Sequence, residues 1–578
     1  MLASIPTDSG IPRAHAFSTL TEALDYAARG ATGLTFHGIR EGHVASLTYA
    51  ALREDARALA QRLLGLGLSR GERVAMLADT SPDFVRAFFG SQYAGLIPTP
   101  LPLPPPFGGR DAYIALITRL MQESRASVLL SPADYLPWLA PVAAGLGLKV
   151  LASVEQLSAV QPSTEALAPS GPDDVAYLQF SSGSTRHPTG VAVRNRAVLA
   201  NTSGIIQHGL KVRPGDRTMS WLPFYHDMGL VGFLLTPVAA QLSIDLLPTA
   251  DFARRPLLWL SILSANKGTL SFSPSFGFEL CLRRRASIPE GIDLSSWRVA
   301  GLGGDMIRPG VLTRFAETFA PQGFRAEALV PSYGMAEATL AISFAELGQG
   351  VRTDEIDLRK LEEEGEAEPA TEQTEKRREF VRCGHVLPGH EIAIRDQGGQ
   401  AQPDRKVGRI MVRGPSIMLG YDGQPERTAE VLSADGWLDT GDLGYMIDGE
   451  VVITGRAKDL ILINGRNIWP QDLEWSVESD IPGIRAGDVV AFSLEEEGKE
   501  QVVMLVEARG LADQAARESM TGDVAGLLRA RHGLESRVVL VPTGSLPQTS
   551  SGKLSRAWAR RKYQAGEFNS LKTEQAAA

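Results

Sequence analysis

The chain has 578 residues, too many for one hydrophobic core, so we expect two or more domains. Its 44% hydrophobic and 22% charged residues are typical of a globular protein, and the net charge of −9 argues against a general nucleic-acid binder. The two cysteines, Cys281 and Cys383, are too far apart in sequence to form a zinc motif or a disulfide framework, which favours a reducing, cytoplasmic location.

No export or transmembrane segment is predicted. The N-terminal sequence MLASIPTDSGIPRAH contains neither a basic region nor an apolar run, so it does not resemble a signal peptide. The longest apolar stretch, residues 228–240, is shorter than the ~20 residues that span a bilayer and contains Pro237. Any lipid that the protein handles is therefore expected to be a bound substrate.

Helix and strand patterns alternate near the N-terminus. Apolar residues recur every three or four positions in residues 47–67, which predicts an amphipathic helix. Residues 73–78 predict a short buried strand, and Ser81 followed by Pro82 marks the start of the next helix. This alternation predicts an α/β fold with mostly parallel sheets. The proline-rich residues 97–106 predict an extended surface connection.

A hydroxyl-rich loop separates two apolar segments in residues 178–193, LQFSSGSTRHPTGVAV. Hydroxyl groups and exposed backbone N–H groups form concave anion sites, and glycine lets a phosphate approach the backbone. A phosphate-binding loop and a polar hairpin turn both explain this stretch when it is taken alone. The candidate phosphate contacts are Ser181, Ser182, Gly183, Ser184 and Thr185.

Two short units each carry a notable titratable residue. In SWLPFYHDMGL, residues 220–230, His226 lies among aromatic and apolar side chains, as a core histidine also would. In PSYGMAEATL, residues 331–340, Glu337 follows a tyrosine, although an isolated glutamate is usually a surface residue. Neither unit predicts a function alone.

Residues 436–474 combine a turn, a hairpin and two cations. Asp442 lies in a turn bounded by glycines, and an Asp-Gly hairpin signal follows it. Arg456 and Lys458 come directly after the second strand of that hairpin. Taken one by one, these are ordinary turns and surface charges.

The composition changes at two places in the second half of the chain. Residues 361–379 are polar and charged, which predicts a solvated loop or insertion. After Lys458 short strands and helices return, which predicts a smaller second domain of about 120 residues. We therefore predict two domains, 1–457 and 458–578.

The final motif is LPQTSSGKLSR, residues 546–556. It is not a P-loop, because Leu554 follows Lys553 and the preceding glycine, Gly544, is too far upstream. Without further context, Lys553 would be a solvated lysine in a basic tail.

Taken in order, five of these motifs resemble the adenylate-forming superfamily of acyl-CoA synthetases, nonribosomal-peptide adenylation domains and luciferases. They are the hydroxyl-rich loop, YGMAE, WLDTGDLG, GRAKD and the terminal SGK, and the resemblance covers about residues 17–565. In most of that superfamily a glycine and a lysine stand where this chain has Arg186 and Thr189. The loop SSGSTRHPTGV, the segment INGRNIWPQDLE and an insertion at about 341–380 instead resemble the fatty acyl-AMP ligases. That branch supplies fatty acids to polyketide and lipopeptide synthases.

This resemblance implies a fold and a reaction. It implies a large N-terminal adenylate-forming domain, with mostly parallel sheets packed with helices, and a small mobile α+β C-terminal domain. It implies that ATP and Mg²⁺ activate a medium- or long-chain fatty acid as acyl-AMP with release of pyrophosphate. The acyl group would then pass to the phosphopantetheine thiol of a separate acyl carrier protein, since no carrier motif follows Lys553.

Site residues are implied by the same motifs. Residues 181–190 would hold the leaving phosphates, and Thr185 and Glu337 would support Mg²⁺, which accepts oxygen ligands. Asp442 would accept the two ribose hydroxyls, with Arg456 assisting, and Tyr333 would flank the adenine. The remaining nucleotide-binding residues implied by the motifs are Gly303, Gly304, Asp305, Ser332, Gly334 and Met335.

Three residues would act in the chemistry or in the domain motion. Lys553 would contact the substrate carboxylate and the α-phosphate together, which suits the compact charge of lysine. His226 would lie between the nucleotide and an apolar acyl tunnel, and Lys458 would be the hinge of the small domain.

The sequence leaves other functions open. A fatty acyl-CoA synthetase uses the same first step, and the loop and the insertion at about 341–380 argue against it. A non-catalytic nucleotide-binding protein is disfavoured because Glu337, Asp442, Arg456 and Lys553 are all present. A serine hydrolase is weaker still, since the chain has no Gly-x-Ser-x-Gly elbow.

Overall fold

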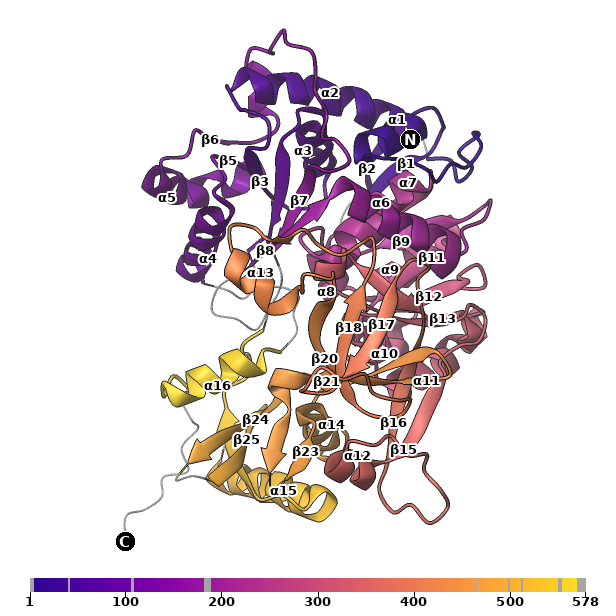
Figure 1. Cartoon of the computed structure of the whole chain (residues 1–578), viewed down its shortest axis with the longest axis vertical. Helices are drawn as coiled ribbons and strands as arrows, with labels where there is room; N and C mark the ends of the chain where they lie inside the picture. The colour runs from indigo at the N-terminus through magenta and orange to yellow at the C-terminus, as the bar shows by residue number, and fades with distance from the viewer. Residues whose placement is uncertain are drawn as a thin grey trace.

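The computed structural model describes residues 5–39, 42–104, 109–180, 189–463, 465–496, 499–510, 513–548 and 554–568 (Figure 1). These residues form a large N-terminal domain and a smaller C-terminal domain, which lies at the bottom of Figure 1. The mixed α/β architecture confirms the predicted fold class. The boundary between residues 457 and 458 stays a prediction.

The centre of the large domain is a 14-stranded sheet, and half of this sheet is mainly parallel. Its parallel strands are β1 (Gly33–Gly38), β9 (Arg217–Ser220), β10 (Ser243–Leu246), β11 (Leu270–Ser273), β12 (Val299–Leu302) and β13 (Leu329–Gly334). The α-helices between β9 and β13 are α7 (Thr236–Ala239), α8 (Thr249–Arg254), α9 (Leu257–Asn266), α10 (Ser275–Arg283) and α11 (Pro309–Phe319). Strands β9 to β12 are buried at every position, which is typical of parallel strands.

The other half of this sheet is antiparallel. It contains β14 (Ala341–Phe344), β15 (Thr353–Asp357), β16 (Arg377–Val386), β17 (Glu391–Arg395), β18 (Gly408–Arg413), β20 (Leu438–Ile447) and β21 (Glu450–Arg456). At the opposite edge β2 (Gly42–Thr48) pairs with β1 in antiparallel orientation. The sheet therefore changes direction between β13, which contains the first two residues of the YGMAE unit, and β14.

A four-stranded parallel sheet lies beside the large one. Its strands are β3 (Arg73–Leu77), β4 (Ile97–Leu101), β5 (Val128–Leu130) and β6 (Val150–Ala152). The helices of this region are α1 (Leu20–Ala27), α2 (Tyr49–Gly65), α3 (Pro82–Tyr93), α4 (Arg110–Ser124) and α5 (Leu136–Leu146). Helix α2 and strand β3 confirm the predicted elements, and the Ser81 side chain accepts a hydrogen bond from the Phe84 N–H as the predicted N-cap.

The proline-rich segment 97–106 is not a surface connection at its start. Residues 97–101 form β4, and every one of them is buried. Strand β4 is the edge of its sheet, in the order β4-β3-β5-β6, so Pro98 and Pro100 are tolerated there without an N–H group. The prediction of a surface connection was wrong for residues 97–101, because proline is also accepted in an edge strand.

The C-terminal domain has its own apolar core. Its three-stranded sheet consists of β24 (Val489–Glu496), β25 (Lys499–Glu507) and β26 (Ser536–Val541). A hairpin of β22 (Ile461–Ile463) and β23 (Arg466–Ile468) precedes it, and its helices are α14 (Pro470–Asp480), α15 (Gln514–His532) and α16 (Arg556–Gln564). Within the described part of the chain, no helix combines the length and the apolar character needed to cross a membrane.

The charged segment 361–379 is more ordered than predicted. It overlaps α12 (Leu358–Glu364) and the start of β16, and β15 pairs with β16 in antiparallel register. Leu361 and Ala367 are fully buried in an apolar cluster with Phe380. Few apolar residues anchor this segment, so its composition resembled that of a solvated loop.

Charged and aromatic contacts join the two domains. The Trp475 ring of α14 contacts two guanidinium groups of the large domain, and its centroid lies 4.8 Å from the guanidinium of Arg308 and 4.7 Å from that of Arg378. Arg308 also pairs with Glu478 of α14 at 2.7 Å. At a second contact, Arg466 of β23 pairs with Glu362 of α12 at 2.5 Å.

Candidate active site

Three predicted nucleotide-binding residues from three strands meet at one point. Tyr333 ends β13, while Asp442 and Arg456 face each other across the β20–β21 pair. The Tyr333 hydroxyl donates a hydrogen bond to Asp442 Oδ2 at 2.8 Å, and Arg456 Nε lies 3.3 Å from Asp442 Oδ1. The register of the antiparallel hairpin thus places the predicted acceptor, Asp442, beside the predicted cation, Arg456.

The electrostatics of this cluster follow from burial. Burial raises the pKa of Asp442, and Arg456 and the Tyr333 hydroxyl act in the opposite direction. Burial and then Asp442 raise the pKa of Tyr333 well above its usual value, so its hydroxyl stays a donor. Asp442 raises the pKa of Arg456, which keeps that guanidinium charged while 51% of its side chain is exposed.

A cavity of about 200 Å³ adjoins this cluster. It is lined by Arg409, Thr440, Gly441, Arg456, Ala457 and Lys458. Gly441 has a φ of +73°, a conformation that glycine adopts readily, and the Gly441 N–H donates to Asp439 at 2.9 Å. The glycine-bounded turn therefore shapes the cavity wall and brings Arg456 and the predicted hinge residue Lys458 to the same hollow.

The GLGGDM segment follows β12 at its carboxyl end, which is where parallel sheets bind ligands. A Cβ atom at Gly303 would come within 2.9 Å of the Ser332 hydroxyl of the neighbouring strand β13, and Gly304 has a φ of +80°. Asp305 accepts hydrogen bonds from the Ser275 N–H at 3.2 Å and from the Ser275 hydroxyl at 3.3 Å. The carboxylate of Asp305 thus holds the start of α10.

A strained turn at Thr339 follows the YGMAE unit. A Cβ atom at Gly334 would lie 1.8 Å from the Leu340 carbonyl, so only glycine fits there. Thr339 has a φ of +70° and a ψ of −59°, and the Leu340 N–H bonds to the Ala338 carbonyl at 2.9 Å, which defines a γ-turn. The Thr339 hydroxyl donates to the Ser416 carbonyl at 2.6 Å and holds the strained residue in place.

Glu337 lies on a single helical turn, Ala336–Ala338, inside this unit. Its carboxylate is half-buried, and Oε1 accepts a hydrogen bond from the Tyr421 hydroxyl at 3.0 Å. Such an oxygen donor fits Mg²⁺, which usually uses one or two carboxylates together with substrate phosphates. The described residues contain no group of three or more His, Cys, Asp or Glu side chains that could hold a metal.

His226 precedes a π-helix, Met228–Leu235, in which six of the eight residues are buried. Its ring centroid lies 4.8 Å from that of Tyr225, and the Tyr225 carbonyl accepts a hydrogen bond from Gln179 of β7 (Val175–Phe180). The π-helical form is frequent at functional sites. His226 is thereby positioned next to the strand that leads into the hydroxyl-rich loop.

The hydroxyl-rich loop and the terminal lysine fall outside the described residues. This applies to Ser181, Ser182, Gly183, Ser184, Thr185 and Lys553. The strands that flank the loop are described: β7 pairs with β8 (Gly190–Arg194), with Phe180 opposite Gly190. Beside Lys553, Gln548 forms a β-bridge with Leu554.

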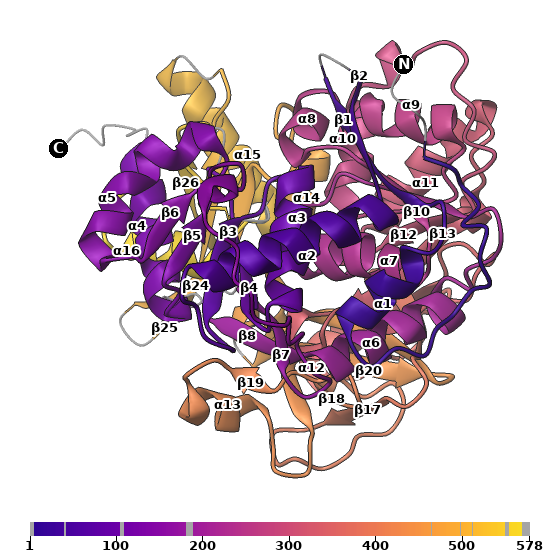
Figure 2. The same ribbon diagram turned by 90° about the horizontal axis from the view of Figure 1, so that it is seen from above.

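Two residues near the site were missed by sequence reasoning. Arg409 lines the cavity beside Arg456, and Tyr421 binds Glu337 although 84 residues separate the two. Tyr421 belongs to the two-residue strand β19 (Gly420–Tyr421), which pairs with β8 and lies beside α13 (Pro425–Val431) (Figure 2). No local pattern marks either residue, because both reach the site through strand pairing.

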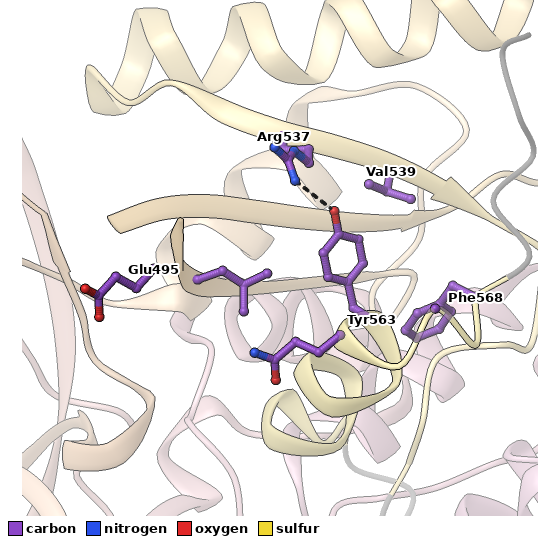
Figure 3. Close-up of a pocket in the computed structure, with 8 residues that line it drawn as sticks. Glu495, Arg537, Val539, Tyr563 and Phe568 are labelled. Atoms are coloured by element: carbon purple, nitrogen blue, oxygen red, sulfur yellow. Dashed lines mark hydrogen bonds between the residues drawn. The ribbon is translucent and has the colours of Figure 1, made fainter. Parts of the chain in front are cut away.

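A larger hollow of about 700 Å³ lies away from these residues, in the small domain. Figure 3 shows it between α16 and the sheet, where Arg537 donates to the Tyr563 hydroxyl at 3.4 Å. Its lining residues are Leu494, Glu495, Arg537, Val539, Tyr563, Gln564, Gly566 and Phe568. None of these is a predicted site residue, so its size does not make it the candidate active site.

Known proteins resemble this chain over almost its whole length. The model of the AMP-binding enzyme family matches residues 24–422. A Caulobacter vibrioides protein, provisionally named an acyl-CoA synthetase, is 53% identical over 96% of this chain and 96% of its own. The medium-chain-fatty-acid–[acyl-carrier-protein] ligase JamA of Moorena producens is 33% identical over 96% of both chains. A solved structure from studies of fatty acyl-adenylate ligases from E. coli and L. pneumophila has a TM-score of 0.92 and 43% identity, covering 96% of this chain and 100% of its own.

Proposed function

The chain belongs to the AMP-binding enzyme family, and we propose that it is a fatty acyl-AMP ligase that loads a carrier protein. In the first step a fatty acid and ATP give acyl-AMP and pyrophosphate. In the second step the phosphopantetheine thiol of a separate carrier protein attacks the acyl carbon, and AMP leaves. The observation that carries the proposal is the Tyr333–Asp442–Arg456 cluster, whose guanidinium is open to a cavity at the predicted hinge.

The resemblance to fatty acyl-AMP ligases is confirmed by the 43% identical structure of that kind, which aligns with 96% of this chain. JamA, which is named a ligase of medium-chain fatty acids and acyl carrier protein, supports the carrier as acceptor. These similarities extend over both domains, so they support the two steps together.

The chain's own residues would first bind and orient the nucleotide. Asp442 is a buried carboxylate and would accept hydrogen bonds from the two ribose hydroxyls. Arg456 would reach the ribose from the cavity side. The Tyr333 ring would flank the adenine, next to Gly303 and Gly304 at the ends of the parallel strands. Holding the two reactants in line supplies a large part of the rate enhancement of such a reaction.

Two anions must meet in the first step, because the fatty acid carboxylate attacks the α-phosphorus. We propose that Lys553 and residues 181–185 neutralise these charges, since preorganised donors stabilise charge that develops in the transition state. Glu337 and Thr185 would hold Mg²⁺, which neutralises charge on the phosphates when it is bound. His226 would separate the nucleotide from the acyl tunnel, whose candidate walls include the buried Met228–Leu235 helix.

The second step would need the small domain to move about Lys458, as hinged domains do when a site is completed and reopened. Asp459, the next residue, pairs with Arg556 of α16 at 3.0 Å. The predicted hinge is thereby linked to the helix that begins three residues after Lys553. Motion at the hinge would therefore move the terminal motif as well.

The test of the proposal is product analysis by mass spectrometry. Dodecanoate, ATP and Mg²⁺ are supplied, and either CoA or a phosphopantetheinylated carrier protein is then added. We expect acyl-AMP that persists with CoA and is consumed by the carrier. If no tested fatty acid yields acyl-AMP in either reaction, the proposal is wrong.

An acyl-CoA synthetase remains the second candidate, because the 53% identical relative carries that name. Rapid formation of dodecanoyl-CoA in the same experiment would select it. The two candidates share the first step and the same nucleotide site, so only the acceptor of the acyl group separates them.

A further inference from the structure

We infer that Tyr421 is a positioning residue that aims the Glu337 carboxylate at the metal bound with ATP. The inference rests on the proposed function, since it takes Glu337 as a Mg²⁺ ligand. Tyr421 itself would touch neither substrate nor metal. It would act through the direction that it gives to one oxygen of Glu337.

Two hydrogen bonds hold Glu337 from the same segment. The Tyr421 hydroxyl donates to Glu337 Oε1 at 3.0 Å, and the Met418 N–H donates to the Glu337 carbonyl at 2.8 Å. Both the side chain and the backbone of the glutamate are therefore fixed by residues 418–421. An ionised carboxylate only accepts hydrogen bonds, so with Oε1 engaged by Tyr421, Oε2 would be the oxygen more open to a cation.

Strand pairing links this segment to the hydroxyl-rich loop. In β19, Tyr421 lies opposite Val191 of β8, and the next residue donates its N–H to the Gly190 carbonyl at 2.8 Å. Gly190 begins the strand that leaves the loop. The hydroxyl of Tyr421 thus connects Glu337 to the strand that starts two residues after residues 181–188, where the phosphates would be held.

Tyr421 is itself held through its backbone, its ring and the residue that follows it. Its N–H donates to the Thr428 hydroxyl at 2.9 Å, and the Arg427 guanidinium lies 5.3 Å from its ring centroid. The adjacent Asp422 accepts hydrogen bonds from Arg73 at 2.9 Å and from Arg125 at 2.6 Å. A phenol anchored in this way has a defined direction, as a positioning residue requires.

A second tyrosine–carboxylate bond shows what a structural pair looks like. Tyr445 donates to Asp354 at 2.7 Å, and Arg405 places two nitrogens on the same carboxylate at 3.0 and 3.1 Å. A cation of the protein already neutralises Asp354. Among the described residues Tyr421 is the hydrogen-bond partner of the Glu337 carboxylate, and a tyrosine leaves the negative charge available to a metal.

The experiment measures the binding of Mn²⁺, which serves as a probe for the metal. Full-length protein and Tyr421→Phe are titrated with Mn²⁺ in the presence of ATP and the absence of fatty acid, and unbound Mn²⁺ is measured by electron paramagnetic resonance. We expect Mn²⁺ binding to weaken by about tenfold in Tyr421→Phe, the usual consequence of removing a partner that orients a metal ligand. The phenylalanine ring keeps the packing, so the melting temperature should change little.

Three controls make the result specific. Tyr445→Phe removes a hydrogen bond of the same kind elsewhere and should leave Mn²⁺ binding unchanged. Glu337→Gln should weaken binding at least as much as Tyr421→Phe, and adding Tyr421→Phe to it should cause no further loss, as expected for coupled residues. In the acyl-AMP assay, Tyr421→Phe should raise the Mg²⁺ concentration for half-maximal rate and leave the KM for the fatty acid unchanged.

The inference is overturned if Tyr421→Phe binds Mn²⁺ as the unaltered protein does, or if its loss adds fully to that of Glu337→Gln. It is also overturned if Glu337→Gln binds Mn²⁺ normally, since Tyr421 would then have no ligand to orient. Failure of the proposed function is a separate result, because the unaltered protein would then form no acyl-AMP from any fatty acid.

Discussion

Two arginine–carboxylate pairs on either side of the predicted hinge are built differently. Arg456, in the large domain, approaches Asp442 through Nε at 3.3 Å, and 51% of its side chain is exposed. Arg556, in the small domain, binds Glu474 at 2.8 and 2.6 Å and Asp459 at 3.0 Å, and 24% of its side chain is exposed. The first pair leaves most of its donors open to a cavity, while in the second every guanidinium nitrogen donates to a protein carboxylate.

The difference teaches how to separate a binding arginine from a structural one. Guanidinium donors are arranged in a rigid fork, and a fork satisfied by protein carboxylates has nothing left for a ligand. Both arginines lie in recognisable motifs, GRAKD and LPQTSSGKLSR, and only the resemblance to a known family singled out Arg456. The exposure of the side chain and the number of its partners distinguish the two.

The largest expected effect is on the structural pair. Arg556→Ala leaves Glu474, which is nearly buried, without its cation, and breaking a buried ion pair costs about 3–5 kcal/mol. We expect the free energy of unfolding of the small domain to fall by about that amount in urea denaturation. The matched control is Arg529→Ala, which removes an exposed pair with Glu535 and should change little. Equal stability of both variants would contradict the assignment of Arg556 as structural.

A second prediction concerns the binding pair. Asp442→Asn keeps the shape of the side chain and removes its charge, so we expect kcat/KM for ATP to fall about 100-fold, or about 2.7 kcal/mol, with the fold retained. Pyrophosphate release measures the rate, and a thermal melt checks the fold. If the variant instead loses stability as Arg556→Ala does and keeps its activity, the comparison between the two pairs fails.

A third prediction tests the contact between the domains. Arg308→Ala removes the ion pair with Glu478 and one of the two cation–π contacts of Trp475, which together stabilise the docked small domain by about 1–2 kcal/mol. We expect faster limited proteolysis near residues 457–470 and a larger change in acyl transfer to the carrier than in acyl-AMP formation. Arg314→Ala, at an exposed pair with Glu279, is the control and should match the unaltered protein.

The smallest expected effect is a pH dependence of the small domain. Burial and then Arg531 lower the pKa of His532 from 6.5 to about 4, and His532 shares a hydrogen bond with Ser476 at 2.9 Å. The unfolded chain therefore binds more protons than the folded one between these values, so stability falls as the pH drops from 6.5 to about 4. At pH 5.5 the loss is about 1 kcal/mol.

His532→Gln should flatten this dependence when unfolding of the small domain is followed in urea at a series of pH values. The matched control is His390→Gln in the large domain, which should leave the pH dependence of the small domain unchanged. Burial lowers the pKa of His390 as well, and Ser416 Oγ lies 2.6 Å from its Nε2. If the slope is the same with and without His532, another group titrates in this range.

A deletion of the charged segment would be a poor test of the predicted insertion. Removing residues 361–379 would cut into α12 and β16, and it would take the buried side chains of Leu361 and Ala367 out of their apolar cluster. Arg466→Ala breaks the Glu362 contact with the small domain and leaves both elements intact. Formation of acyl-CoA by this variant would support a role of the insertion in excluding CoA.

The sequence by itself determined the family and the plan of one large and one smaller domain, and it predicted the residues of the site. Local signals sufficed for this, because five short motifs in one order are each read within a dozen residues. The same locality explains the helix Tyr49–Gly65 and the N-cap at Ser81, which depend on neighbours three and four positions away.

Tertiary structure alone decided which of these residues touch. The facing of Asp442 and Arg456 depends on hairpin register, the contact of Tyr421 with Glu337 spans 84 residues, and the burial of residues 97–101 depends on their place at a sheet edge. The physical reason is that strand pairing and packing join segments that share no local pattern. A motif names a side chain, and only the fold assigns its partners and its exposure.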